Sequence, residues 1–263
     1  MSIIEINDLS FNREGKPIFE KLSLVIREKK ITAIMGPSGC GKTTLLKLIS
    51  NQLTSYTGCI QIKRKNIASL TKAESYDLRK DIGILFQNGA LFSDLTVYEN
   101  IAFPIREHTA LSSSLIRDLV LIKLQAVGLR KAGNLMPSQL SVGMAKRVAL
   151  ARAIALDPII IMYDEPFSGQ DPISMSILIK LINLLNKFSN MTTVIVSHDI
   201  QETFEIADYV YIINERKIVA EGTPIEVKNK KDDFIQAFVN AKFNNEETNY
   251  FLTDGYEKSL LFD

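Results

Sequence analysis

Residues 36–44, GPSGCGKTT, have the glycine, lysine and threonine spacing of a phosphate-binding loop, because they fit G-x-x-x-x-G-K-[ST] in full. Glycines let backbone N–H groups converge on phosphate oxygens, and the N-terminus of the following helix adds partial positive charge. In this pattern Lys42 reaches the outer phosphates and Thr43 is a ligand of Mg²⁺. An apolar strand pattern precedes the loop and a helical pattern follows it. The sequence therefore predicts a bound nucleotide with Mg²⁺.

Two adjacent carboxylates, Asp164 and Glu165, follow an apolar stretch within residues 158–166. A carboxylate at that place can hold Mg²⁺ through water, and the next one can act as general base on the attacking water. Alone, such a pair is a weak signal, since it also fits a helix cap before Pro166. After a phosphate loop it favours catalysis, with Asp164 at the metal and Glu165 as the base.

Two further polar side chains stand at predicted strand ends, the side on which α/β sheets bind ligands. His198, near the end of the stretch 192–199, is expected to sense the γ-phosphate, whereas His108 is expected to be a packed or surface residue. Gln87 ends the stretch 81–87 and is expected to contact Mg²⁺ and the attacking water. Phe11 precedes the phosphate loop and either stacks on adenine or belongs to the core; we expect stacking.

A second helix start with the features of an anion site lies in QLSVGMAKR, residues 139–147. Ser141 can cap the helix, and Gly143 lets a ligand come close. A phosphate-binding helix N-terminus on a separate helical subdomain need not serve the chain's own nucleotide. Two cradles in one sequence therefore predict a dimer in which each nucleotide lies between two subunits.

The elements that position these residues are strands alternating with helices, which predicts a parallel α/β sheet. Strands are expected at 29–36, 81–87, 158–166 and 192–199, and helices at 43–53 and 173–188. Residues 209–222 are expected to form a hairpin with NERK as its turn. The stretch from about 89 to 155 has helical periodicity and little strand signal, so we interpret it as a helical subdomain inserted into the sheet core.

The composition of the 263 residues, 46% hydrophobic and 23% charged, is that of an ordinary folded protein. A net charge of +1 gives no electrostatic case for nucleic acid as a partner. The two cysteines, Cys40 and Cys59, have no metal-ligand spacing and suit a reducing compartment. The start of the sequence lacks the features of a secretion signal, and no apolar run approaches the roughly 20 residues that cross a bilayer. Any membrane role is therefore expected to come from a partner.

Together these residues resemble the ATP-binding cassette (ABC) ATPases over residues 3–240, with LSVGM (140–144) similar to the family signature and SGQD (168–171) similar to the loop after the catalytic glutamate. The resemblance implies a RecA-like parallel-sheet core, an N-terminal antiparallel β part and an inserted helical subdomain. It implies one ATPase domain over 1–240 and a tail, 241–263, that could dock on the partner subunit.

The resemblance also implies ATP and Mg²⁺ as cofactors. It places Ser141 and Gly143 on the γ-phosphate of the partner's nucleotide and Asp171 at the dimer interface. The expected catalytic residues are Glu165, His198 and Gln87, and the expected metal ligands are Thr43, Gln87 and Asp164. The residues expected around the nucleotide of the same chain are Phe11, Gly36, Pro37, Ser38, Gly39, Cys40, Gly41, Lys42, Thr43 and Thr44.

A narrower similarity links residues 86–109, the methionine of LSVGM and the stretch DEPFSGQDPI to the ATPases of Mla/MCE lipid transporters. This resemblance implies an ATPase homodimer under two integral-membrane permease subunits, with an MCE-domain lipid-binding protein and a small STAS-domain protein. It implies phospholipid as cargo and a peripheral position at the cytoplasmic face of the inner membrane. The segment GALFSDLTVYENIAF (89–103) would then be helical-subdomain core, a groove for a permease helix, or both.

The sequence departs from the commoner signature LSGGQ at Val142 and Met144. Val142 would strain the turn if its φ were positive, whereas with a negative φ its side chain would point away; we expect the latter, with slowed turnover. Met144 cannot make the polar contacts of glutamine. Two alternatives to lipid transport remain open: transport of another cargo, such as an amino acid or a metal ion, and a soluble cassette ATPase acting on DNA or the ribosome.

Overall fold

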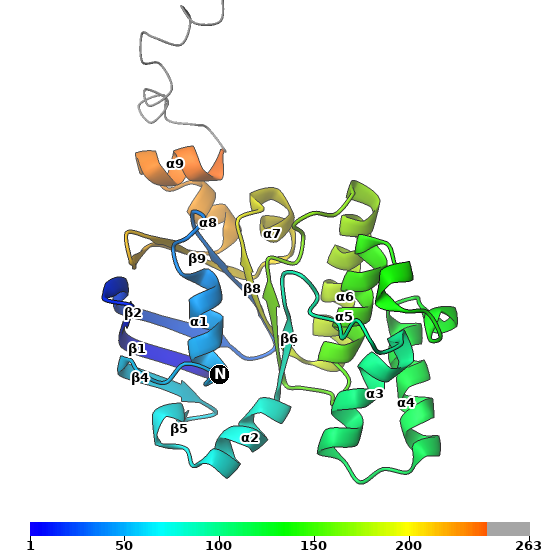
Figure 1. Cartoon of the computed structure of the whole chain (residues 1–263). Coiled ribbons are helices and arrows are strands. Elements are labelled where there is room, and N and C mark those ends of the chain that lie inside the picture. The colour runs from blue at the N-terminus through cyan, green and yellow to red at the C-terminus, as the bar shows by residue number, and fades with distance from the viewer. Residues whose placement is uncertain (241–263) are drawn as a thin grey trace, which may run out of the picture.

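The computed structural model describes residues 1–240, which form two β-sheets with helices packed against them (Figure 1). The tail 241–263, for which the sequence predicts docking on a partner subunit, lies outside the described residues. Within residues 1–240, no helix combines the length and the apolar character that a bilayer crossing requires.

The larger sheet has six strands in the order β10-β9-β3-β8-β7-β6. Its parallel strands are β3 (Ile31–Met35), β6 (Ile82–Leu85), β7 (Ile160–Asp164), β8 (Thr192–Ser197) and β9 (Tyr209–Asn214). β3, β7 and β8 are buried at every residue, as expected for strands covered on both faces. The predicted strands and the parallel sheet are therefore confirmed.

The predicted hairpin is also present, because β10 (Lys217–Gly222) pairs antiparallel with β9. Its turn places Glu215 and Arg216 at φ values of 45° and 69°. Two consecutive positive φ values are typical of the tight turns that match the twist of a hairpin.

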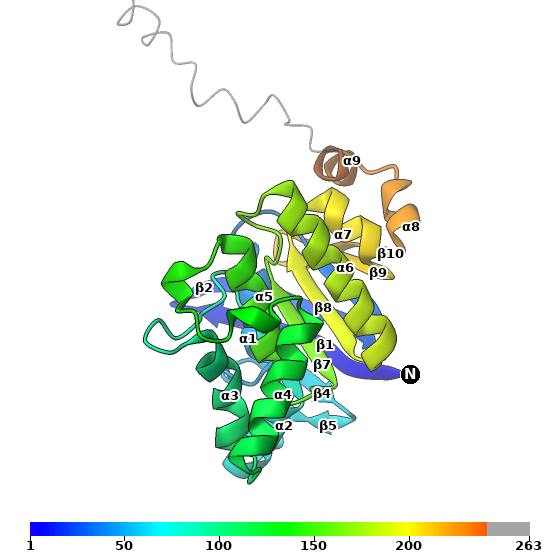
Figure 2. The same ribbon diagram turned by 90° about the vertical axis from the view of Figure 1, so that its right-hand side faces the viewer.

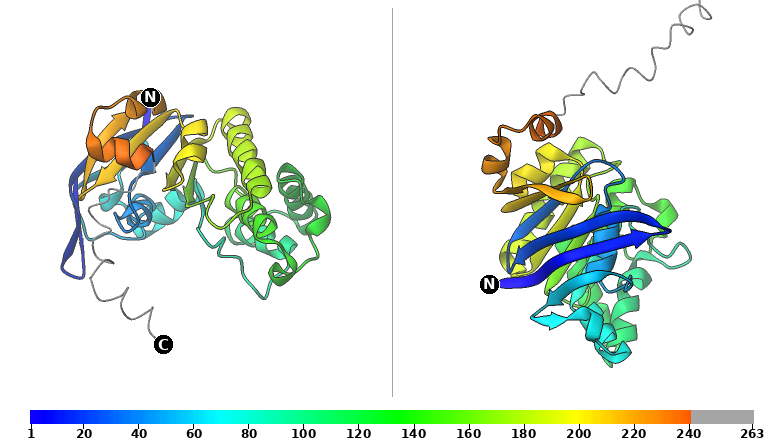
Figure 3. Two further views of the ribbon diagram at one scale, coloured as in Figure 1. Left: turned by 90° about the horizontal axis from the view of Figure 1, so that it is seen from above. Right: turned by 90° about the vertical axis from the view of Figure 1, so that its left-hand side faces the viewer.

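The smaller sheet is antiparallel and has the order β2-β1-β4-β5. Its strands are β1 (Ser2–Arg13), β2 (Lys16–Arg27), β4 (Thr57–Ile62) and β5 (Lys65–Asn66), which lie at the left in Figure 1 and face the viewer in the right panel of Figure 3. Buried side chains of this sheet share one core cluster with β3, β7, β8 and the helix α1 (Lys42–Ile49). This shared core fixes the position of α1, and with it the loop that precedes α1.

The segment 89–155 contains α3 (Val97–His108), α4 (Ser113–Ala126) and α5 (Val142–Ala153), and this fully described segment has no strand. Two short 3₁₀ helices, Arg130–Ala132 and Pro137–Gln139, connect α4 to α5. The helices lie together at one side of the sheet core (Figure 2). Their buried faces form a second core cluster with residues of β7, β8 and α6 (Pro172–Ser189). The helical character predicted for this segment is confirmed.

Two predictions of helices need correction. α1 ends at Ile49 rather than at residue 53, because Ser50 is its C-cap and Asn51 adopts a φ of 55°. The sequence interpretation missed α2 (Lys72–Lys80), which buries no residue and therefore has no apolar stripe to detect. The remaining elements are a 3₁₀ helix, Ile67–Ser69, and the helices α7 (Ile200–Ile206), α8 (Pro224–Lys228) and α9 (Asp233–Val239).

Candidate active site

The phosphate loop joins β3 to α1, and its glycines are required by its shape. Gly36 has a φ of 153° and a Cβ there would lie 2.2 Å from the main-chain oxygen of Ile213. Gly41 has a φ of 101°, and its Cβ would lie 2.6 Å from the Cγ2 atom of Ile18. Gly39 also has a positive φ, of 83°, but faces open space. The loop therefore curls tightly against the protein on one side and stays open on the other.

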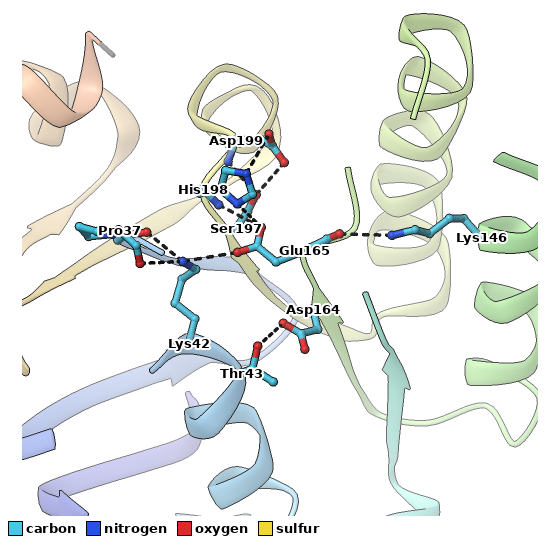
Figure 4. Close-up of polar contacts among 10 residues, drawn as sticks. Pro37, Lys42, Thr43, Lys146, Asp164, Glu165, Ser197, His198 and Asp199 are labelled. Atoms are coloured by element: carbon cyan, nitrogen blue, oxygen red, sulfur yellow. Dashed lines mark hydrogen bonds and ion pairs between the residues drawn. The ribbon is translucent and has the colours of Figure 1, made fainter. Parts of the chain in front are cut away.

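Lys42, the first residue of α1, is 6% exposed and points back into this loop (Figure 4). Its Nζ atom donates hydrogen bonds to the main-chain oxygens of Gly36 at 2.9 Å and Pro37 at 3.1 Å. The same atom lies 3.4 Å from Oε1 of Glu165. In this structure the ammonium group is thus held by groups that a phosphate can replace.

Thr43 and Asp164 face each other across the end of the sheet. Thr43 Oγ1 donates a hydrogen bond of 2.9 Å to Oδ1 of Asp164. Burial raises the pKa of Asp164 above its ordinary value, against the opposing effect of the Thr43 hydrogen bond. A hydroxyl and a carboxylate side by side are oxygen ligands of the kind that Mg²⁺ prefers.

Glu165 is 8% exposed and is held by four contacts besides the one to Lys42. Its N–H group donates to the main-chain oxygen of Val196 at 2.9 Å, and its own main-chain oxygen accepts from Lys146 Nζ at 3.3 Å. Its Oε2 atom accepts from the backbone N–H of His198 at 3.2 Å and lies 2.8 Å from Nδ1 of that ring. These contacts follow from the register of β7 and β8, which places Asp164 opposite Val196.

Glu165 also has a φ of 46°, which is uncommon for a residue with a side chain. The chain therefore turns sharply directly after β7, and the carboxylate is aimed at Lys42 and His198 (Figure 4). On α5, burial lowers the pKa of Lys146, while the charges of Asp164 and Glu165 raise it less.

The candidate site is a cavity of about 350 Å³ on the open side of the phosphate loop. His198 and Gln87 both line it with exposed side chains, so the ends of β3, β6, β7 and β8 meet there as the sequence predicts. The lining residues are Arg13, Ile18, Ser38, Gly39, Gly41, Lys42, Thr43, Thr44, Gln87, Glu165 and His198.

The stacking predicted for Phe11 is not supported by the structure. Phe11 is 6% exposed and packs in the core between the two sheets, where it pairs with Phe19 across β1 and β2. Its ring therefore has no free face for a base. Arg13 and Ile18, at the turn between the same strands, line the cavity instead. No local sequence pattern marks these two residues, since the register of the strands decides which residue reaches the site.

Cys40 lies within the loop with intermediate burial, and its thiol is free. Burial raises the pKa of this thiol more than the nearby charge of Lys42 lowers it. The thiol is therefore less ionised at neutral pH than an exposed cysteine would be.

The helix start predicted at Ser141 is present as the start of α5. Ser141 is the N-cap, and its Oγ atom accepts a hydrogen bond of 3.2 Å from the N–H group of Met144. Val142 is the first helical residue, does not have a positive φ, and is 59% exposed. The valine therefore fits without backbone strain. Neither Ser141 nor Gly143 lines the cavity formed by the phosphate loop of the same chain.

Comparison with known proteins decides the family. A sequence profile described as ABC transporter matches residues 19–168, more than half of the chain. The chain belongs to the ABC transporter family. Over 260 residues this ABC ATPase is 50% identical to the intermembrane phospholipid transport system ATP-binding protein MlaF of Haemophilus influenzae, with 99% of this chain and 98% of that protein covered.

Solved structures agree with this assignment. The ATP-binding cassette MJ0796, as a dimer in a post-hydrolysis state with ADP and Pi, has a TM-score of 0.77 and 28% identity and covers 84% of this chain and 98% of its own. The protein cbiO1 of Clostridium perfringens, part of the ABC transporter complex cbiONQ, has a TM-score of 0.80 and 28% identity, with 95% and 98% coverage. The predicted fold class and ATP hydrolysis by this ABC ATPase are thereby confirmed.

Proposed function

We propose that this ABC ATPase powers a membrane transporter that moves phospholipid between the inner and outer membranes. The observation that carries the cargo is the 50% identity, over nearly all of both chains, to a phospholipid transport ATPase. The resemblance to Mla/MCE transporters supports two permease subunits, an MCE-domain protein and a small STAS-domain protein as partners. It also supports a peripheral position at the cytoplasmic face of the inner membrane.

In our proposal two copies of the chain enclose two nucleotides. Each ATP lies on the Lys42 loop of one protomer and under Ser141 and Gly143 of its partner. The separation of the two cradles within one chain, with neither Ser141 nor Gly143 lining the cavity, supports this arrangement. The dimeric state of the solved cassette MJ0796 supports it as well.

ATP binding would rearrange the contacts of Lys42. The ammonium group leaves the oxygens of Gly36 and Pro37 for the outer phosphates, and its ion pair with Glu165 is broken. Thr43, Asp164 and Gln87 would hold Mg²⁺, which neutralises phosphate charge when it is bound. The released Glu165 takes a proton from the attacking water, and His198, whose Nδ1 atom lies 2.8 Å from Oε2 of Glu165, senses the γ-phosphate.

The permease would dock in a groove of about 370 Å³ between α2, β6, α3 and α5. Phe92 and Phe103 line it, each 42% exposed, with their ring centroids 5.1 Å apart. Ile101 and Ala102, from the same segment, are buried in the helical core. The segment 89–103 thus supplies both core and groove, and the groove is also lined by Phe86, the residue directly before Gln87.

The docking is tested by replacing Phe103 with serine and capturing the chain from membranes in mild detergent. We expect Phe103→Ser to lose the permease, and the matched change Phe188→Ser, at a 72% exposed ring on α6, to retain it. Mass spectrometry of the captured proteins and lipids tests the cargo. Capture of a permease without enriched phospholipid would contradict phospholipid as the cargo.

The shared sites are tested by mixing a Lys42→Ala chain with a Ser141→Ala chain. Each variant alone should be inactive, whereas a mixed dimer regenerates one intact site and should recover ATP hydrolysis. Mixtures without activity, together with full activity of isolated wild-type monomers, would refute the shared site.

A further inference from the structure

The first turns of α5 and α6 are in direct contact at Gly143 and Ser174. A Cβ atom at Gly143 would lie 2.3 Å from Oγ and 2.7 Å from Cβ of Ser174, distances that real side chains do not adopt. Gly143 does not have a positive φ, so its backbone conformation does not itself require glycine. The close approach of α6 is what excludes a side chain at this position.

Each of these two helices begins with a capping side chain that is fixed to its own first turn. Ser141 Oγ accepts from Met144 N–H at 3.2 Å on α5. Asp171 Oδ1 accepts from the N–H groups of Ile173 and Ser174, both at 3.0 Å, on α6. Hydrogen bonding from Ser174 also lowers the pKa of Asp171, so this carboxylate keeps its charge. The position of each cap therefore follows the helix that it begins.

The beginnings of α5 and α6 are also hydrogen-bonded to the backbone of Glu165 and Pro166, directly after β7. Lys146, one turn along α5 from Gly143, donates to the main-chain oxygen of Glu165 at 3.3 Å. Gln170 Nε2 donates to the main-chain oxygen of Pro166 at 2.7 Å, which closes the loop that leads into α6. Both helices are thus held close to Glu165 by hydrogen bonds, and their first turns contact each other at Gly143 and Ser174.

We propose that the contact between Gly143 and Ser174 is a rigid joint that fixes Ser141 relative to Asp171, with Ser174 as a positioning residue. This inference rests on the proposed shared site, in which both caps face the partner protomer. The starts of α5 and α6 then approach the partner protomer as one rigid unit. Ser141 reaches the partner's nucleotide at the same time as Asp171 reaches the partner's surface. If the contact between Gly143 and Ser174 is altered, Ser141 and Asp171 cannot both take their positions against the partner at once.

The joint predicts a graded series of variants, because the two clashing atoms of Ser174 can be removed one at a time. Gly143→Ala meets both atoms and should lower ATP hydrolysis by the assembled transporter at least about tenfold. Gly143→Ala with Ser174→Ala still meets the Cβ atom at 2.7 Å and should recover little. Gly143→Ala with Ser174→Gly removes both clashing atoms, so that the next atom, Gln170 Oε1, is at 3.9 Å, and it should recover most of the activity.

Measurements of ATP binding and of ATP-dependent dimerisation distinguish this positioning role from general loss of folded protein. ATP binding by the isolated chain, which uses the Lys42 loop, should stay within about twofold of wild type in all three variants. ATP-dependent dimerisation, measured by size-exclusion chromatography in a Glu165→Gln background, should be lost with Gly143→Ala and restored with the added Ser174→Gly.

Two outcomes would overturn the joint. Full activity of Gly143→Ala would show that the contact constrains nothing, and failure of Ser174→Gly to rescue would show that Gly143 is needed for another reason, such as close approach to phosphate. Inactive mixtures of Lys42→Ala and Ser141→Ala chains would instead refute the proposed function. The two failures are therefore distinguishable.

Discussion

The ion pair between Lys42 and Glu165 leads to a prediction about ATP affinity as well as rate. The two groups are buried and 3.4 Å apart, and ATP must separate them to reach Lys42. At that distance and an effective dielectric constant of about 20, their attraction is about 5 kcal/mol before desolvation is subtracted. When ATP binds, its phosphates replace Glu165 as the negative partner of Lys42 and recover most of this attraction. Removing the charge of Glu165 should therefore make the free energy of ATP binding more favourable by only about 1–2 kcal/mol.

Glu165→Gln should therefore bind ATP about tenfold more tightly than wild type, since 1.4 kcal/mol corresponds to a factor of ten. The same change removes the general base, so hydrolysis should fall by about 10²- to 10⁴-fold. The closed, ATP-loaded dimer should accumulate as a result. Equilibrium titration with ATP, single-turnover hydrolysis and size-exclusion chromatography measure the three effects.

Glu205→Gln, an exposed position on α7, is the matched control, because it removes the same charge outside the cavity. It should leave affinity and rate unchanged. A Glu165→Gln chain that hydrolyses ATP at the wild-type rate would show that Glu165 is not the base. Unchanged or weaker ATP binding would show that Glu165 does not compete with the nucleotide for Lys42.

Three further predictions concern the single residues Val142, Cys40 and Asp164. Val142→Gly should raise ATP turnover of the assembled transporter severalfold, since the exposed valine stands where the partner's nucleotide would approach; an unchanged rate would count against this. A maleimide should modify Cys40 slowly, because burial raises its pKa, and ATP should protect the thiol; equal labelling with and without ATP would contradict its place in the cradle. Asp164→Asn should abolish Mg²⁺-dependent hydrolysis yet raise the melting temperature of the nucleotide-free chain by about 2–4 °C at pH 7. The sign follows from the raised pKa of Asp164, because the folded chain binds the carboxyl proton more tightly than the unfolded chain does. The free energy of unfolding therefore falls as the pH rises from the ordinary pKa of aspartate through the raised one, and an asparagine avoids this loss. A lower melting temperature for the asparagine variant would refute it.

Most residues that line the cavity beside the phosphate loop could be predicted because local signals define them. The loop from Gly36 to Thr44 is a continuous motif, and Gln87, Glu165 and His198 follow apolar strands whose carboxyl ends meet at one edge of a parallel sheet. Strand identity alone therefore brings these side chains together. The roles of the individual side chains stay predictions.

The remaining features depend on contacts between distant segments. Whether Phe11 or Arg13 reaches the cavity depends on the pairing of β1 with β2, and apolar character alone made Phe11 fit both a base and a core. The packing of Gly143 on Ser174 involves residues 31 positions apart, on helices whose crossing no local pattern encodes. The miss of α2 is a separate case, because this helix buries no residue and so shows no apolar periodicity, although the capping box of Thr71 and Glu74 is a local signal for its start.

One guanidinium group limits how freely the segment after Gln87 can move. Arg152, on α5, donates hydrogen bonds of 2.8 Å to the main-chain oxygens of both Gly89 and Ala90, and it lies over the ring of Phe92. Phe92, which lines the groove, and the backbone of Gly89 and Ala90 are therefore held to the same side chain of α5. If the permease docks in this groove as proposed, a displacement of Phe92 would be passed through Arg152 to the backbone of Gly89 and Ala90, two and three residues after Gln87. The fit between permease and groove would then influence the rate of hydrolysis.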